Sequence, residues 1–130
     1  MEEAITAALL ADPGLAALAA DRVTWGLRQQ GSALPAVVLM RVDGAPVYCD
    51  DGETGLFSGR LQVDCWGATY ASAKTLARAV KALLSGARFT QGGVEFQAVW
   101  IELEQDLYEQ GTGSEPDLYR TSIDFGIWHS

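Results

Sequence analysis

Four carboxylates in the second half of the chain come nearest to the spacing of a chemical site: Glu102, Glu104, Asp106 and Glu109. Clustered carboxylates are the ligands that hard cations such as Ca²⁺ prefer. Glu102 and Glu104 are two positions apart in an expected strand, so their side chains should project from the same face. The Asp-rich loop spacing of calcium sites is missing from the sequence. The cluster therefore predicts a solvated acidic surface rather than a metal site.

The other residue types that carry catalysis form no recognisable arrangement. The single histidine, His129, lies beside the last residue, where solvent exposure is more usual than a role as catalytic base. Gly111-Thr112-Gly113 lacks the lysine and the strand-to-helix context of a phosphate-binding loop. Cys49 and Cys65 match no metal or redox spacing, which favours two reduced thiols packed as small hydrophobes. The sequence predicts no enzyme activity, no metal and no cofactor.

A basic row and two tryptophans are candidates for contacts with another protein. Lys74, Arg78 and Lys81 fall on the outer face of an expected helix. Such a row is either a charged face exposed to solvent or a surface that meets the acidic surface of another copy of the chain. Trp66 and Trp128 point away from the apolar faces of their expected strands. They are either covered by the N-terminal helices or anchor a subunit interface, where Trp is enriched.

The charge balance excludes two classes of partner. The 130 residues include 17 acidic and 9 basic side chains, which gives a formal net charge of −8. Gripping nucleic acid through its phosphates needs surplus Lys and Arg, and so does binding an anionic membrane surface. No segment approaches the ~20 apolar residues of a membrane span. The acidic start Met-Glu-Glu differs from a secretory signal, so we expect synthesis in the cytoplasm.

Composition and length indicate a folded chain with one core. At 48% hydrophobic and 20% charged residues, the chain is too apolar to be disordered. Its length fits one domain, residues 1–130.

Three helices are expected to position these residues. Glu2 to Ala11 and Pro13 to Ala20 are Ala-rich and depend on packing, with Asp12 able to cap the second helix. The third helix, Tyr70 to Ser85, is the clearest, with Thr69 as N-cap and Gly86 after its end. Its apolar residues form one continuous stripe: Ala73, Leu76, Ala77, Val80, Leu83 and Leu84.

Four segments have the patterns of strands: Ala36–Val42, Phe57–Trp66, Val94–Leu103 and Leu118–Trp128. The polar stretch Asp43–Gly55 is either a long exposed loop or an extended hairpin, and Gln110–Asp117 is a loop. Gly92-Gly93 predicts a tight turn. The apolar positions of Val94–Leu103 switch from even to odd numbers, which suggests either a bulge or a part that is covered on both faces.

The order of these elements predicts the fold class. It reads α-α-β-β-α-β-β, and hairpin-like connections dominate. We therefore expect an α+β domain with a mostly antiparallel, four-stranded sheet and helices packed on one face.

Three parts of the sequence resemble the tail completion (tail terminator) proteins of long-tailed phages, prophages and gene transfer agents. The first is the segment from Gln62 to Tyr70, QVDCWGATY, followed directly by an Ala-rich helix. The second is the start of the chain, with LADPGL, Asp21-Arg22-Val23 and Leu34-Pro35 before the first strand. The third is the closing part, with DLYE, LYR and SIDFGIW. The resemblance spans nearly the whole chain and rests on order and spacing.

The resemblance implies a structural virion protein of the tail and neck. Its subunits would form a hexameric ring that caps the tail tube, ends tube polymerisation and joins a head-completion (stopper) protein. DNA would pass through the lumen without specific binding, and acidic side chains there would repel its phosphates. The residues that we expect to face the lumen are Asp50, Asp51, Glu53, Glu102 and Glu104. Those expected at the subunit interface are Lys74, Arg78, Lys81, Trp66 and Trp128.

Two other functions remain open from the sequence. The chain could be another neck component or a minor tail protein of the same particle. It could also be a small cytoplasmic α+β domain that binds a ligand, although no convergent set of polar residues suggests a pocket.

Overall fold

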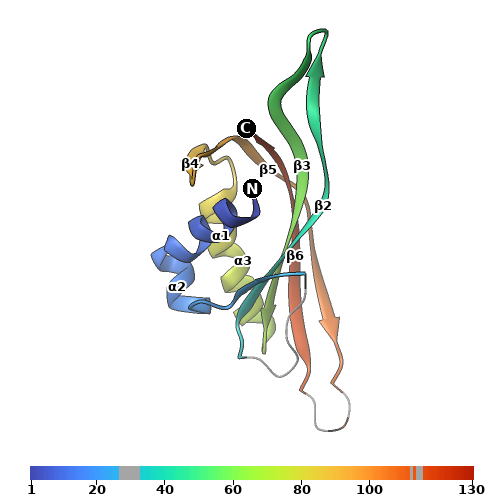
Figure 1. The fold of residues 1–130 in the computed structure, drawn as a ribbon. Coiled ribbons are helices and arrows are strands. Elements are labelled where there is room, and N and C mark those ends of the chain that lie inside the picture. The colour runs from blue at the N-terminus through green and yellow to red at the C-terminus, as the bar shows by residue number, and fades with distance from the viewer. Residues whose placement is uncertain (27–32, 112, 114–115) are drawn as a thin grey trace.

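In the computed structural model, helices lie against one face of a twisted sheet (Figure 1). The structure describes residues 1–26, 33–111, 113 and 116–130. Within them lie three helices and six strands. In chain order these are α1 (Glu2–Ala11), α2 (Pro13–Ala19), β1 (Val23–Trp25), β2 (Ala36–Cys49), β3 (Gly52–Gly67), α3 (Tyr70–Leu84), β4 (Phe89–Gln91), β5 (Val94–Glu109) and β6 (Leu118–His129).

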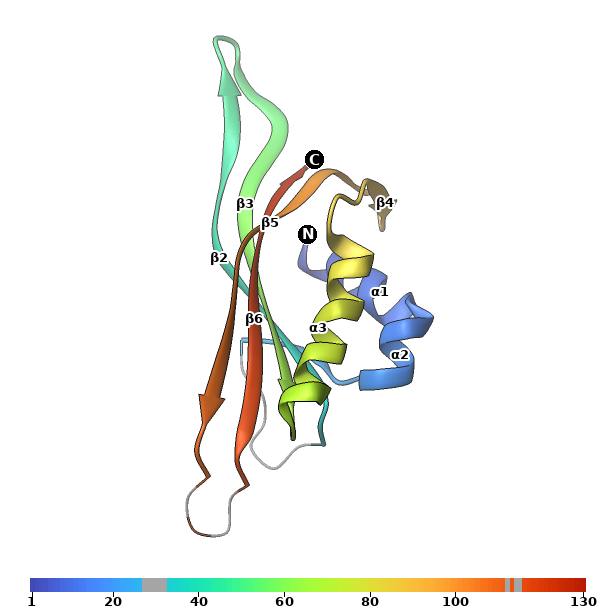
Figure 2. The same cartoon turned by 180° about the vertical axis from the view of Figure 1, so that it is seen from behind.

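The sheet has the strand order β1-β2-β3-β6-β5-β4. β1 runs parallel to β2, and every other pairing is antiparallel. The prediction of a mostly antiparallel α+β fold with helices on one face is confirmed (Figures 1 and 2). The prediction of four strands is wrong, because β1 and β4 form the two edges of the sheet. Each has three residues, too few to show an alternating pattern.

Local signals account for the helix boundaries, which agree with the predictions to within one residue. The side chain of Asp12 accepts a hydrogen bond from the Leu15 amide at 3.0 Å and caps α2. Thr69 Oγ1 accepts one from the Ser72 amide at 3.0 Å and caps α3. Gly86, with φ of 73°, follows the end of α3 in a conformation that suits glycine.

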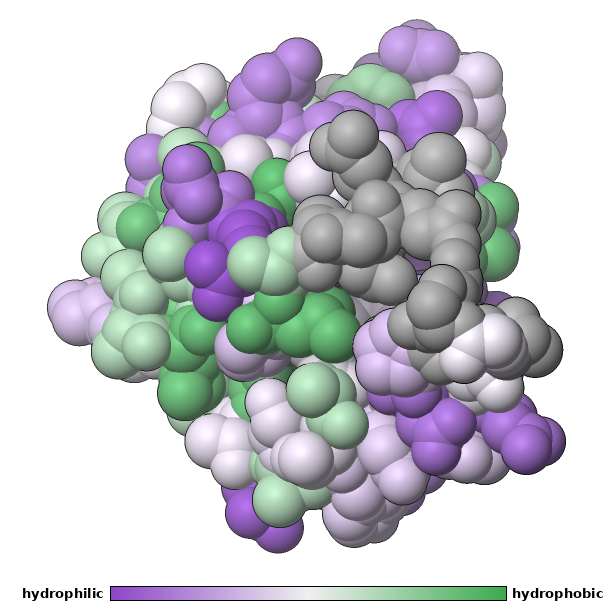
Figure 3. All heavy atoms as spheres, turned by 90° about the horizontal axis from the view of Figure 1, so that it is seen from below, coloured by the Kyte–Doolittle hydropathy of each residue, from purple (hydrophilic) through white to green (hydrophobic). Residues whose placement is uncertain are grey.

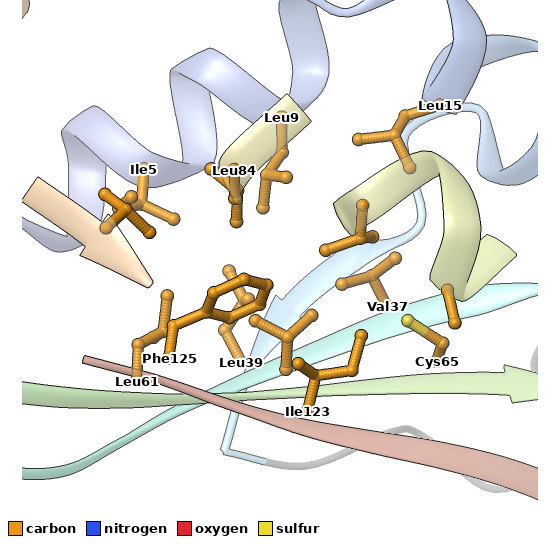
Figure 4. Close-up of a cluster of buried hydrophobic side chains, with 14 of the residues drawn as sticks. Ile5, Leu9, Leu15, Val37, Leu39, Leu61, Cys65, Leu84, Ile123 and Phe125 are labelled. Carbon is orange, nitrogen blue, oxygen red and sulfur yellow. The ribbon is translucent and has the colours of Figure 1, made fainter. Parts of the chain in front are cut away.

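The core lies between the helices and the middle of the sheet (Figure 4). Ile5 and Leu9 of α1 and Leu15 of α2 point toward the sheet and are almost fully buried. The predicted stripe of α3 is buried as expected, except that Leu83 is only partly covered. Seen from below, hydrophobic side chains surface on the helix side among hydrophilic ones, as expected for Ala-rich helices that depend on packing (Figure 3).

Two hairpins extend beyond the helix-covered part of the sheet, at opposite ends of the molecule (Figures 1 and 2). We call Asp43 to Gly59 the β2–β3 arm, and the outer ends of β5 and β6, Leu107–Glu109 and Leu118–Arg120, the β5–β6 arm. The first arm confirms the extended-hairpin alternative for Asp43–Gly55. The strands run further than predicted because their outer parts are polar and exposed, and so lack hydrophobic alternation.

A bulge in β5 decides which way its side chains point. The register with β6 shifts between Phe96 and Ala98 and again between Ile101 and Leu103. The predicted bulge is thereby confirmed. Each extra residue reverses the alternation of the positions that follow it.

Candidate assembly surfaces

The bulge between Ile101 and Leu103 sends the first two carboxylates of the acidic cluster to opposite faces of the sheet. Glu102 accepts a hydrogen bond from Arg60 Nε at 2.6 Å, on the sheet face opposite the helices, which we call the open face. Glu104 instead bonds Lys74 and Lys81 of α3 on the helix side. The prediction that Glu102 and Glu104 share a face is therefore wrong. The extra residue between Ile101 and Leu103 is the physical reason.

Lysines of α3 and carboxylates of β5 form a lysine–carboxylate network. Lys74 Nζ lies 3.3 Å from Glu104 Oε1 and 2.9 Å from Asp106 Oδ1, and Lys81 Nζ lies 3.1 Å from Glu104 Oε2. Tyr70 and Thr121 each donate a hydroxyl hydrogen bond to Asp106 at 3.0 Å. The network ties α3 to the base of the β5–β6 arm. Two members of the predicted basic row therefore have acidic partners within their own chain.

The network shifts the pKa values of its members toward the charged forms. The hydrogen bond from Lys74 holds the pKa of Asp106 below its ordinary value, and the same bond raises the pKa of Lys74. Partial burial would raise the pKa of Glu104, but the hydrogen bonds and charges of Lys81 and Lys74 outweigh it and leave that pKa lowered.

Replacing Glu104 by Gln is expected to lower the free energy of unfolding at pH 7 by roughly 1 kcal/mol, the scale of partly exposed ion pairs. Because folding lowers the pKa values of Glu104 and Asp106, their stabilisation is complete above about pH 5 and lost as pH falls below about 4. E104Q should therefore also flatten the acid limb of the stability profile. Urea denaturation between pH 7 and pH 3 measures both effects. E109Q, at an exposed carboxylate without an ion pair among the described residues, is the matched control; an equal loss in both variants would contradict the role of the network.

Arg78, the middle residue of the basic row, stays exposed and forms no ion pair within the part of the chain that the structure describes. It remains the member of the row best placed to contact another subunit.

The helices do not cover Trp66 or Trp128, which corrects the first of the two alternatives for these residues. Both lie on the open face, because their strand neighbours Cys65 and Ile127 point into the core. The Arg120 guanidinium lies 5.1 Å from the centre of the Trp66 ring and also pairs with Asp64 at 3.4 Å. Trp128 is 41% exposed. The open face thus carries the exposed aromatic surface of Trp128 beside the partly covered ring of Trp66.

Further apolar and acidic side chains share this open face. Met40, Trp100 and Leu103 are exposed there. The Trp100 ring lies against Gly126 and occupies the space where a side chain at position 126 would begin. Burial raises the pKa of Asp124, and the charges of Asp64 and Glu102 add to this shift while Arg60 opposes it.

The tip of the β2–β3 arm carries the other acidic group, Asp50, Asp51 and Glu53. All three are exposed, and Glu53 accepts a hydrogen bond from the Tyr48 hydroxyl at 3.3 Å. The tip lies at the end of the molecule furthest from the β5–β6 arm (Figure 1). The structure therefore does not bring this group together with Glu102 or Glu104 within one subunit.

The single histidine and the two cysteines differ in how far they are buried. His129 is half-buried rather than exposed, stacked on Phe57 with ring centres 5.5 Å apart. Burial raises the pKa of the Cys65 thiol, whereas Cys49 is exposed and does not pack as predicted. Among the residues with described positions, no group of three His, Cys, Asp or Glu side chains could hold a metal ion. None of the described helices has the length and apolarity to span a membrane.

Sequence reasoning missed Arg60, Arg120 and Tyr70 as members of these surfaces. Arg60 and Glu102 are 42 positions apart, and Tyr70 and Asp106 are 36 apart. No local spacing could have joined them.

The chain is similar to proteins of known family and known fold. A family model described as Tail completion protein gp17 matches residues 3–130. A chain of the solved structure "Virion of native gene transfer agent (GTA) particle" has a TM-score of 0.78 at 22% identity, covering 99% of this chain and 93% of that chain, and so shares the fold. A second solved chain has a TM-score of only 0.49 at 18% identity, over 97% of this chain and 89% of that chain. None of the curated proteins matches the sequence.

Proposed function

Because the chain belongs to the family of Tail completion protein gp17, we propose that it forms a hexameric ring that caps the tail tube and ends tube polymerisation. The ring then provides the surface that joins the tail to a head-completion protein. Family membership makes the chain a structural protein of a phage-type virion tail. The similarity of its fold to a chain of a gene transfer agent virion supports this role.

The observation that carries the ring proposal is the pair of arms at opposite ends of the subunit (Figure 1). A two-stranded hairpin is marginally stable alone in water, and the outer parts of both arms bury little within their own chain. The open face likewise exposes Trp100, Leu103 and Trp128. Contiguous exposed apolar surface of this kind marks a protein interface. Contacts between copies in a ring would cover the outer parts of both arms.

The negative net charge of the chain suits a ring through which DNA passes. A lumen that repels phosphates lets the duplex slide instead of binding it. We propose Asp50, Asp51, Glu53 and Glu102 as contributors to that charge. Glu104 contributes less, because Lys74 and Lys81 already neutralise it. The candidates for subunit contacts are Arg78, Trp66 and Trp128. Lys74 and Lys81 are less suited to this role, because they form ion pairs within their own chain.

Deleting the gene from the genome that encodes the particle is expected to give tails of abnormal length or tails without heads. Electron microscopy of the particles measures both defects, and a plasmid copy of the gene should restore normal particles. Normal particles from the deletion strain would contradict the proposal. Tails of normal length that lack heads would indicate another neck component rather than a terminator.

A further inference from the structure

Among the residues that the structure describes, the sheet has a long unpaired edge on each side. β1 pairs with β2 only from Val37 to Leu39, so no described strand pairs with the outer edge of Met40–Cys49. β4 pairs with β5 only from Val94 to Phe96, and the Val99 carbonyl accepts the Gly86 amide. Beyond it, Trp100–Glu109 has no described neighbour on its outer side. Such edges are templates for pairing with another chain.

The two free edges match in length and in direction. Each covers the same number of residues, Met40–Cys49 on β2 and Trp100–Glu109 on β5. β2, β3, β6 and β5 alternate in direction, because each neighbouring pair is antiparallel. When one copy is placed beside another in the same orientation, β2 of the first therefore runs antiparallel to β5 of the second. This is the more stable of the two pairing modes.

We propose that the free edge of β2 in each subunit pairs with the free edge of β5 in the next, so that the ring is lined by one closed β-barrel with all helices outside. The inference rests on the proposed ring and names the surfaces that close it. A head-to-tail contact of this kind uses two different surfaces and forms a ring when the rotation between copies closes.

The free edges lie at different heights, and the difference fits a barrel. Gly44, Gly59, Ile127 and Val99 face one another across the four strands. The centre of the free β5 edge lies about five residues beyond that level, or ~17 Å along the strand. Four strands at ~4.8 Å spacing are ~19 Å wide. Copies joined at the centres of their free edges would thus tilt by ~40°, within the 35–45° that is typical of barrels.

The direction of the offset places the helices outside. The connection from β3 through α3 to the parallel strand β5 has the usual right-handed sense. Viewed from the helix side with the β2–β3 arm upward, β2 is on the right and β5 on the left, in agreement with Figures 1 and 2. Right-twisted strands coil around a barrel in a right-handed sense. In a barrel that coils in this sense, a subunit pairs with its right-hand neighbour along the upper part of its right edge, and with its left-hand neighbour along the lower part of its left edge. In the structure, the right-hand strand β2 is free in its upper part and the left-hand strand β5 is free in its lower part, as this arrangement requires.

The barrel would give the open face a defined environment. Six copies of four strands would form a backbone cylinder roughly 48 Å across, wide enough for a DNA duplex after side chains are added. Glu102 and Asp124 would face the lumen, and so would Trp66 and Trp128, in place of the subunit contacts proposed for them above. Pro46, which lacks an amide hydrogen, and the bulge between Arg41 and Asp43 restrict which strands can pair with β2.

Disulfide cross-linking in purified tails tests the pairing. In a Cys49→Ser background, Ala45→Cys is combined in turn with Leu103→Cys, Gln105→Cys or Leu107→Cys, all on the open face. Two strands separate these positions within a subunit, at least ~14 Å, so a disulfide must join two copies. Oxidation should produce a ladder of covalent species up to six subunits for at least one pair. Single variants, and Ala45→Cys combined with Ala82→Cys on the exposed side of α3, should give none.

Amide hydrogen exchange of the unmodified protein, free and in tails, provides a readout that no substitution can disturb. Exchange in Met40–Cys49 and Trp100–Glu109 should slow at least tenfold on assembly. If the protein is present in tails without a ladder and without slowed exchange in these segments, the edge pairing is wrong and the ring proposal stands. If the protein is absent from tails, the proposed function fails, and the edge pairing fails with it.

Discussion

A variant in which Asn-Gly replaces Val47–Leu56 is expected to fold normally and to yield almost no joined particles. Pro46 and Phe57 are partners across the arm, so a two-residue turn can connect them. None of the removed residues belongs to the core, and the free energy of unfolding should change by no more than about 0.5 kcal/mol. The deletion removes the tip of the arm and the last part of the free β2 edge.

The expected loss is large because the same contact recurs around the ring. Losing about 1.4 kcal/mol at one interface weakens that association tenfold, and a closed ring of six copies repeats the loss six times. Urea denaturation measures folding, and counts of joined particles after complementation of the deletion strain measure assembly. Wild-type counts would show that the arm is dispensable.

A second variant separates the length of the arm from its charge. Asp50→Asn, Asp51→Asn and Glu53→Gln together keep the hairpin and remove its acidic tip. Joined particles from this variant, but not from the shortened one, would assign assembly to the backbone and reach of the arm. Failure of both variants would assign it to the acidic side chains.

Gly67→Ala is expected to lower the free energy of unfolding by about 1–3 kcal/mol, the usual range for overpacking. A Cβ atom at Gly67 would lie 2.5 Å from the Ala73 backbone nitrogen and 3.1 Å from the Ala73 Cα. Both atoms belong to the backbone of α3, which cannot move aside as a flexible side chain could. The whole helix would shift and disturb the packing of Leu76 and Val80 in the core.

Gly44→Ala is the matched control for this prediction. It adds the same methyl group to the same sheet, but its nearest neighbour is the Ser58 carbonyl oxygen at 3.7 Å, an ordinary contact. Its midpoint in urea should stay close to that of the wild type. Equal midpoints for the two variants would show that α3 tolerates the displacement.

The parts of the fold that the sequence predicts well are those fixed by local contacts. Thr69 and Asp12 cap their helices within three residues, and the stripe of α3 repeats at helical spacing. These signals placed all three helices. They also gave the central portions of the four long strands, where burial on one face imposes alternation.

The assembly surfaces were harder to predict because they depend on register. One extra residue after Ile101 sends Glu102 to the open face and Glu104 to α3. Lys74 and Glu104 lie 30 positions apart and meet only after β5 has paired with β6. The charges of these residues could be read from the sequence, whereas their partners required the order of the strands.

The central place of β6 in the sheet has a consequence for biosynthesis. It is the last strand in chain order, yet it joins the β2–β3 hairpin to β5 and supplies Ile123, Phe125 and Ile127 to the core. Each hairpin can form within microseconds from neighbouring segments, but β3 and β6 pair residues as far apart as Phe57 and His129. The core therefore closes only after Leu118–His129 has left the ribosome, and an incomplete nascent chain cannot present a finished subunit to a growing tail.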